Sequence, residues 1–93
     1  MSQEQKKKVD YEALVSSFMR IPKMDISTAR SLMNLGYKES FQLVGLSPEV
    51  LFEEIRKKDP KVSRDLLFKL RMAIYFVETP EPDPKKMDPL QWI

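Results

Sequence analysis

Apolar residues recur at helical spacing in short blocks that are separated by proline, glycine and capping residues. In the first block, residues 10–20, they stand three and four positions apart, which is typical of an amphipathic helix. Asp10 is a favourable N-cap, and Pro22 restricts the backbone before it, so we expect this helix to end near residue 20. A second helix is predicted from its N-cap Asp25 to about residue 35, where Gly36 can take the left-handed conformation that ends many helices.

The second half of the chain predicts three more helical elements. Residues 40–44 are expected to form one short turn, closed by a glycine. A helix opens at Ser47-Pro48, a cap followed by proline at the first helical position, and ends at Asp59-Pro60. The longest helix is predicted over residues 63–78. The fold class expected from this pattern is all-α.

The predicted long helix has apolar residues on two opposite sides. One stripe consists of Leu66, Leu67, Leu70, Ala73, Ile74 and Val77, and the other of Phe68, Met72, Tyr75 and Phe76. A helix of this kind is either the central one of a bundle, contacted on both faces, or it uses its aromatic stripe for self-association. Both interpretations stay open at this point.

Four prolines within residues 80–89 predict an extended, polyproline-like C-terminal tail over residues 79–93. The tail nevertheless contains apolar side chains, including Met87 and Trp92. We therefore expect it to pack on the helical domain, residues 10–78, and to cover the aromatic stripe in its own subunit or in a partner. Residues 1–9 are polar and basic and are expected to be disordered.

Composition narrows the range of functions. A chain of 93 residues makes one domain, and 42% hydrophobic residues are enough for a core. There is no cysteine and no histidine, which disfavours metal sites, cofactors and hydrolytic catalysis. No apolar run is long enough for a membrane span and no signal peptide is evident, so the expected location is the cytoplasm, with no membrane partner. The formal net charge of +2 is low for a dedicated nucleic-acid binder.

A weak internal repeat relates two segments that lie 22 residues apart, residues 21–29 and 43–51. Each reads as an apolar residue, a turn, a cap and then a helix. Two units of this kind, packed about a pseudo-twofold axis, form a double helix-hairpin-helix domain, and a fifth helix can complete its core. The predicted architecture is therefore a five-helix, double helix-hairpin-helix bundle of the SAM-like type.

Several local motifs resemble those of a known family. They are Ile21-Pro22 with Ser27-Thr28-Ala29, Leu35-Gly36, Gln42-Leu43, Gly45, Pro48-Glu49 with Leu51-Phe52, Ala73-Ile74-Tyr75-Phe76, and the tail from Glu78 to Pro84 closing on Trp92. From Phe18 to Trp92 the chain resembles the small bacterial helix-hairpin-helix proteins termed "pathogenicity locus" proteins. These are similar to the C-terminal domain of competence regulators, and some carry an inherited mitomycin-resistance label.

The resemblance implies a stand-alone helix-hairpin-helix fold and, through that fold, nucleic-acid binding. Two departures from the family pattern bear on this function. The family hairpin resembles Pro-Gly-Ile-Gly, whereas this chain has Pro22-Lys23-Met24-Asp25. The family tends to have a cysteine at the start of its long helix, where this chain has Leu66, so a role that needs that thiol is not expected here.

One functional hypothesis is weak, sequence-nonspecific DNA binding, because glycines let a hairpin approach a phosphate and free helix amides donate to it. The candidate phosphate-binding residues are Lys23, Met24, Ser27, Thr28, Arg30 and Gly45. Asp25 acts against this hypothesis, since its carboxylate would occupy the same amides and repel a phosphate. We expect it to act as an internal cap.

The alternative is a protein-interaction or homodimerisation module. Its candidate surface consists of Phe68, Met72, Tyr75, Phe76 and Trp92, which are residue types that are enriched in interface cores. No carboxylates stand in a paired constellation, and no glycine-rich loop or small-molecule substrate site is evident. No catalytic residues are therefore assigned, and the chain is not expected to be an enzyme.

Overall fold

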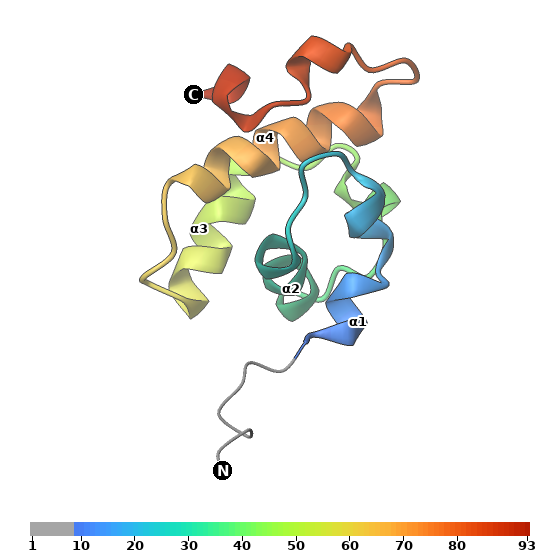
Figure 1. The fold of residues 1–93 in the computed structure, drawn as a ribbon. Helices are drawn as coiled ribbons and strands as arrows, with labels where there is room; N and C mark the ends of the chain where they lie inside the picture. Colours follow the sequence, from blue (N-terminus) through green and yellow to red (C-terminus); the bar gives the residue numbers. More distant parts are fainter. Residues whose placement is uncertain (1–8) are drawn as a thin grey trace.

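The computed structural model describes residues 9–93, and within that range the chain is helical, with no strand. The elements, in chain order, are α1 (Tyr11–Leu14), η2 (Ser17–Arg20), α2 (Ile26–Asn34), η3 (Ser40–Leu43), α3 (Pro48–Lys58), α4 (Asp65–Glu78), η4 (Pro84–Lys86) and η5 (Pro89–Trp92), where η denotes a 3-10 helix. The all-α prediction is confirmed for these residues. The predicted disordered N-terminus lies outside them, except for Val9. Figure 1 shows α4 crossing above α2 and α3, with the C-terminal tail on its far side.

The prediction of one continuous helix over residues 10–20 is wrong. The α-helix ends at Leu14, and a separate 3-10 turn, η2, follows. The break lies at Ser16, whose backbone is extended and whose hydroxyl donates to the carbonyl oxygen of Ala13 at 2.6 Å. Serine side chains compete in this way with the helical hydrogen-bond pattern. After this break, the side chain of Phe18 is buried in the core.

Helices α2 and α3 begin as their caps predict. Asp25 accepts a hydrogen bond from the amide of Thr28 at 2.7 Å, and Ser47 accepts one from the amide of Val50 at 3.2 Å. After α2, Gly36 adopts the left-handed conformation with a φ of 105°, as the sequence predicts. Side-chain caps satisfy amides that have no partner inside their own helix, and this fixes where each helix starts.

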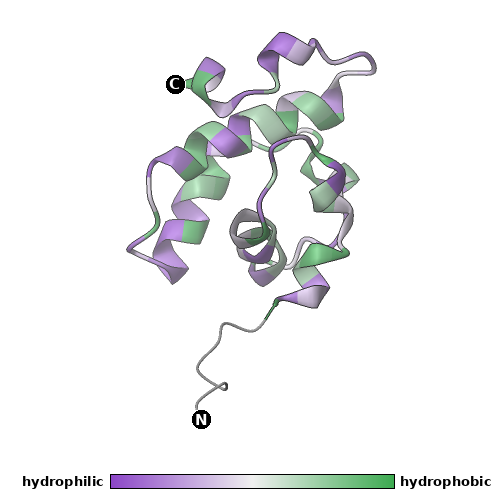
Figure 2. Cartoon of the chain, in the orientation of Figure 1, coloured by the Kyte–Doolittle hydropathy of each residue, from purple (hydrophilic) through white to green (hydrophobic). Residues whose placement is uncertain are grey.

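Helix α4 is the central element of the core. It buries Leu66, Leu67, Leu70, Met72, Ala73 and Ile74. It packs against α3 and η3 within the domain and against η5 of the tail, so it is contacted from both sides. Figure 2 shows mainly hydrophobic residues along it. Within residues 9–93 no helix, α4 included, has the length and apolar character that crossing a membrane requires.

The tail is not extended, which corrects the polyproline prediction. Pro84 and Pro89 each occupy the first position of a 3-10 turn, where a missing amide proton does no harm. The aspartate before each proline caps its turn: Asp83 accepts from the amide of Lys85 at 2.9 Å, and Asp88 accepts from that of Leu90 at 3.0 Å. The prolines therefore start helical turns instead of preventing them.

Candidate functional site

The two segments of the internal repeat form similar turns. In the first, the amide of Met24 donates to the carbonyl oxygen of Ile21 at 3.1 Å, and the corresponding bond of the second turn has the same length. The third residue of each turn is left-handed, Lys23 with a φ of 64° and Gly45 with a φ of 82°. Positive φ at this position is typical of a type II turn and favours glycine. Lys23 thus has the backbone conformation of a hairpin glycine, although it has a side chain.

Asp25 closes the first hairpin from within, as expected from its position. One carboxylate oxygen accepts from the amide of Thr28, and the other accepts from the ammonium of Lys69 at 2.5 Å. Burial raises the pKa of Asp25, but the hydrogen bonds from Lys69 and Thr28 outweigh it and hold that pKa below its usual value. The ionised carboxylate therefore occupies the amide that a bound phosphate would need.

Arg30 is not directed to the hairpin. Its guanidinium donates to Asp10 at 2.7 Å and to Glu12 at 2.7 Å, so it connects α2 to α1. Asp10 also caps α1 by accepting from the amide of Ala13 at 3.1 Å. The hydrogen bond from Arg30, followed by that from Ala13, lowers the pKa of Asp10 to about 2. These bonds give Arg30 a structural role.

Burial or nearby carboxylates act against phosphate binding by the other predicted residues of the first hairpin. Thr28 is buried, and Met24 packs partly against the core. Ser27 and Thr28 line a shallow pocket of about 280 Å³, whose charged side chains are Asp25, Asp59, Asp65 and Lys69. Three carboxylates against one ammonium disfavour an anion there.

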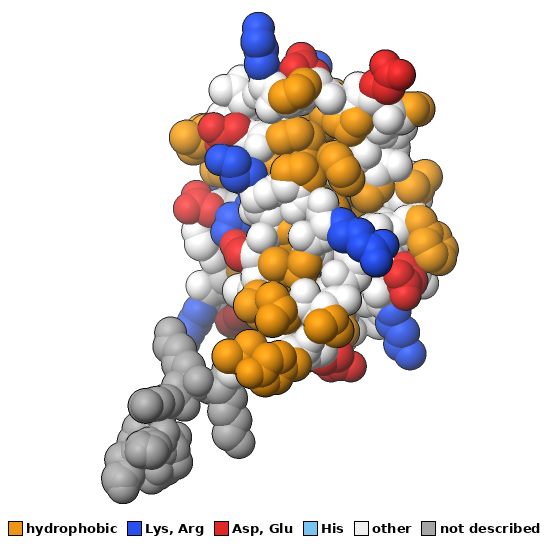
Figure 3. Space-filling model, turned by 45° about the vertical axis from the view of Figure 1, so that its right-hand side comes forward, with side chains coloured by type: hydrophobic (Ala, Val, Ile, Leu, Met, Phe, Trp, Pro, Cys, Tyr) orange, Lys and Arg blue, Asp and Glu red, His pale blue; other side chains and the backbone are white. Residues whose placement is uncertain are grey.

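The second hairpin is closed as well. The amide of Gly45 donates to the carboxylate of Glu78 at 2.6 Å. Of the predicted phosphate-binding residues, Lys23 alone combines an exposed cationic side chain with no ion pair within residues 9–93. Figure 3 shows Lys and Arg side chains scattered among acidic and hydrophobic ones on the face it presents, without a continuous basic surface.

The aromatic stripe of α4 is partly covered, and its Tyr75 contacts the tail. Met72 is fully buried, and the ring of Trp92 lies 5.2 Å from that of Tyr75 between centroids. The hydroxyl of Tyr75 accepts from the amide of Asp83 at 2.8 Å, and the indole of Trp92 donates to the carbonyl oxygen of Lys86 at 2.7 Å. Phe68 and Phe76 are also partly buried against the core. Of the predicted interaction residues, Tyr75 and Trp92 therefore line an accessible groove.

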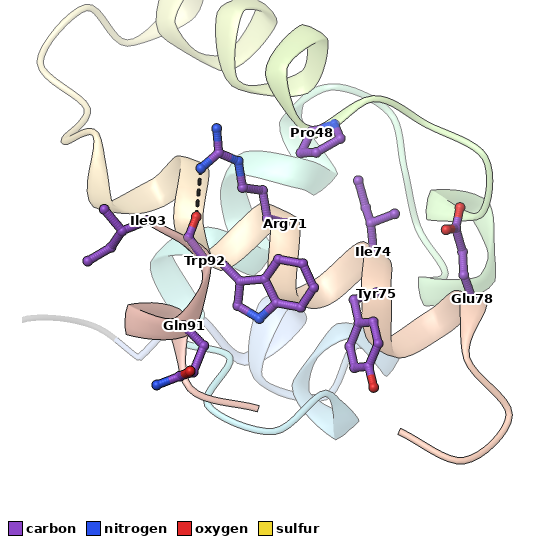
Figure 4. Close-up of a pocket in the computed structure, with 8 residues that line it drawn as sticks. All are labelled: Pro48, Arg71, Ile74, Tyr75, Glu78, Gln91, Trp92 and Ile93. Carbon is purple, nitrogen blue, oxygen red and sulfur yellow. Dashed lines mark hydrogen bonds between the residues drawn. The ribbon is translucent and has the colours of Figure 1, made fainter. Parts of the chain in front are cut away.

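This groove lies between α4, the start of α3 and the tail, and has a volume of about 570 Å³. Its lining residues are Pro48, Arg71, Ile74, Tyr75, Glu78, Gln91, Trp92 and Ile93. Figure 4 shows Arg71 and Glu78 at opposite ends, with Ile74 and Tyr75 between them. We call it the α4–tail groove. Its size is within the range of ligand-binding clefts.

Arg71 also lines the groove, and its role was not predicted from the sequence. Its guanidinium donates to the carbonyl oxygen of Trp92 at 2.6 Å and to the carboxylate of Glu49 at 3.2 Å. The hydrogen bond that Glu49 receives from its own backbone amide, with the bond from Arg71, holds the pKa of Glu49 below its usual value. Arg71 thus joins the tail to α3. The spacing of Arg71, Ile74, Tyr75 and Glu78 on one helix face was the available sequence signal.

Comparison of the chain with family models, with curated proteins and with solved structures finds no match. The geometry of the hairpins and of the α4–tail groove is therefore the basis on which a function can be inferred.

Proposed function

We propose that this chain is a non-catalytic protein-interaction module on a double helix-hairpin-helix scaffold, and that the α4–tail groove is its interface. The paired turns at Lys23 and Gly45, each followed by a capped helix, support the scaffold. The observation that favours the groove is its lining by Trp92, Tyr75 and Arg71. Tryptophan, tyrosine and arginine are the residue types that contribute most often to binding energy at interfaces.

The groove also has an exposed apolar side chain at its margin. Ile93, which lines it, is 77% exposed. An exposed apolar side chain beside a concave site is available for contact with a partner. In the hairpins, in contrast, the amides of Thr28 and Gly45 already have acceptors in Asp25 and Glu78.

A peptide library displayed on phage tests this proposal directly. We expect selection on the folded protein to enrich peptides whose binding is weakened at least about tenfold by Ile93→Asp, measured by calorimetry with the synthetic peptides. The matched control is Val15→Asp, at a residue that is 78% exposed and does not line the groove. If no peptide is enriched, or if both variants affect binding equally, the groove is not the interface.

Nucleic-acid binding is the second candidate function, favoured by Lys23. This residue is exposed, holds a glycine-like conformation at the tip of a hairpin and has no ion pair within residues 9–93. With Asp25 as neighbour, contact with a phosphate would depend on the ammonium alone. Such binding would be weak and would not distinguish sequences.

An anisotropy titration with labelled duplex and single-stranded oligonucleotides checks this second candidate. We expect a Kd of roughly 10⁻⁴ to 10⁻⁶ M that weakens as salt is raised, as for nonspecific phosphate contacts. Lys23→Ala should weaken binding, whereas Lys38→Ala, at an exposed lysine outside residues 21–29, should leave it unchanged. The absence of binding to either oligonucleotide at low salt would remove nucleic acid from consideration.

A further inference from the structure

The residues of α4 that line the α4–tail groove include a cation at one end, Arg71, and a carboxylate at the other, Glu78. Arg71, Ile74, Tyr75 and Glu78 are spaced i, i+3, i+4 and i+7, so they share one face of α4 and all line the groove. At 1.5 Å per residue, the two charged positions lie roughly 10 Å apart along the helix axis. Figure 4 shows the two side chains at opposite ends, with the apolar side chains between them.

Both charged groups keep capacity for a further partner. Arg71 bonds to the carbonyl oxygen of Trp92 and to Glu49, but a guanidinium has five donor hydrogens. Glu78 is exposed and accepts from the amide of Gly45, but a carboxylate has about four acceptor positions. One end of the groove therefore offers donors and the other end offers acceptors.

We infer that the partner in this groove is a second copy of the same chain, with the two α4 helices antiparallel about a two-fold axis near Ile74 and Tyr75. This inference rests on the proposed function of the groove. In a two-fold interface, the same surface of both copies is paired with itself in reverse. Arg71 of each copy then lies opposite Glu78 of the other, while a parallel arrangement would place like charges together.

Apolar contacts complete this arrangement. Ile93 lines the groove and is 77% exposed, so in the dimer it is available to enter the groove of the other copy. The rings of Tyr75 and Trp92, with the largely buried Ile74 beside them, form the apolar centre against which it would pack. An apolar centre flanked by charges is the usual composition of a specific interface.

Charge reversal tests the pairing. Arg71→Glu places two carboxylates at each contact of its own dimer, and Glu78→Arg places two cations there. We expect each variant alone to dimerise at least about tenfold more weakly than the native chain in sedimentation velocity. An equimolar mixture of the two should recover dimers, because both contacts of the mixed dimer then join opposite charges. Mixing does not restore the intramolecular bonds that each variant has lost, so recovery of dimers must come from the contact between copies.

Three results would overturn the inference. The first is a monomeric native chain up to high micromolar concentration, and the second is a mixture that associates no better than either variant. The third result is for the case in which thermal melts show that either charge variant is unfolded. It is an Ile93→Asp variant that dimerises as strongly as the Val15→Asp variant. A monomeric chain that still binds selected peptides would leave the proposed function standing without this partner. A monomeric chain with no peptide ligand would contradict both.

Discussion

Replacing Phe18 by alanine should lower the free energy of unfolding by about 3 to 5 kcal/mol, the usual cost of removing a buried aromatic ring. Phe18 is 0% exposed and lies in η2, in the core that α4 completes. The matched control is Phe41→Ala, because Phe41 holds the same second position in the 3-10 turn η3 but is 70% exposed. The control should change stability by less than about 0.5 kcal/mol.

Urea unfolding followed by circular dichroism measures both values. Equal losses of stability in the two variants would contradict the packing described for η2 and η3. The comparison also isolates burial from residue type, because both changes remove the same ring from the same kind of turn.

Replacing Met87 by alanine should lower the free energy of unfolding by about 2 kcal/mol, toward the low end of the range for a buried methionine, because Met87 lies in the tail and keeps 8% exposure. Leu90→Ala is the control within the same tail, since Leu90 is 67% exposed and its loss should cost less than about 0.5 kcal/mol. The same unfolding experiment measures both variants. A tail that only lies loosely over α4 would make the two changes equally small.

The sequence predicted those features of the fold that local chemistry decides. Asp25 and Ser47 are caps, and Gly36 ends a helix, for reasons that act within a few residues of each position. The break at Ser16 and the turns after Asp83 are also local, yet they depend on competing side-chain hydrogen bonds that the helical period does not reveal.

The site was harder to predict, because its members meet through tertiary packing. Arg30 was expected at the hairpin because it follows Thr28 closely, but Asp10 lies within its reach only after α1 packs on α2. The role of Arg71 likewise depends on where the tail places the carbonyl oxygen of Trp92. Spacing along one helix places Arg71 and Glu78 on the same face, but it could not have shown that the tail and the start of α3 form a groove beside that face.

The position of Trp92 has a practical consequence. It is the sole tryptophan of the chain, it lines the α4–tail groove, and its ring contacts Tyr75. Indole emission shifts toward the blue when water is displaced from the ring. The ultraviolet emission spectrum of the unmodified protein is therefore a built-in, label-free sensor of whatever enters the groove.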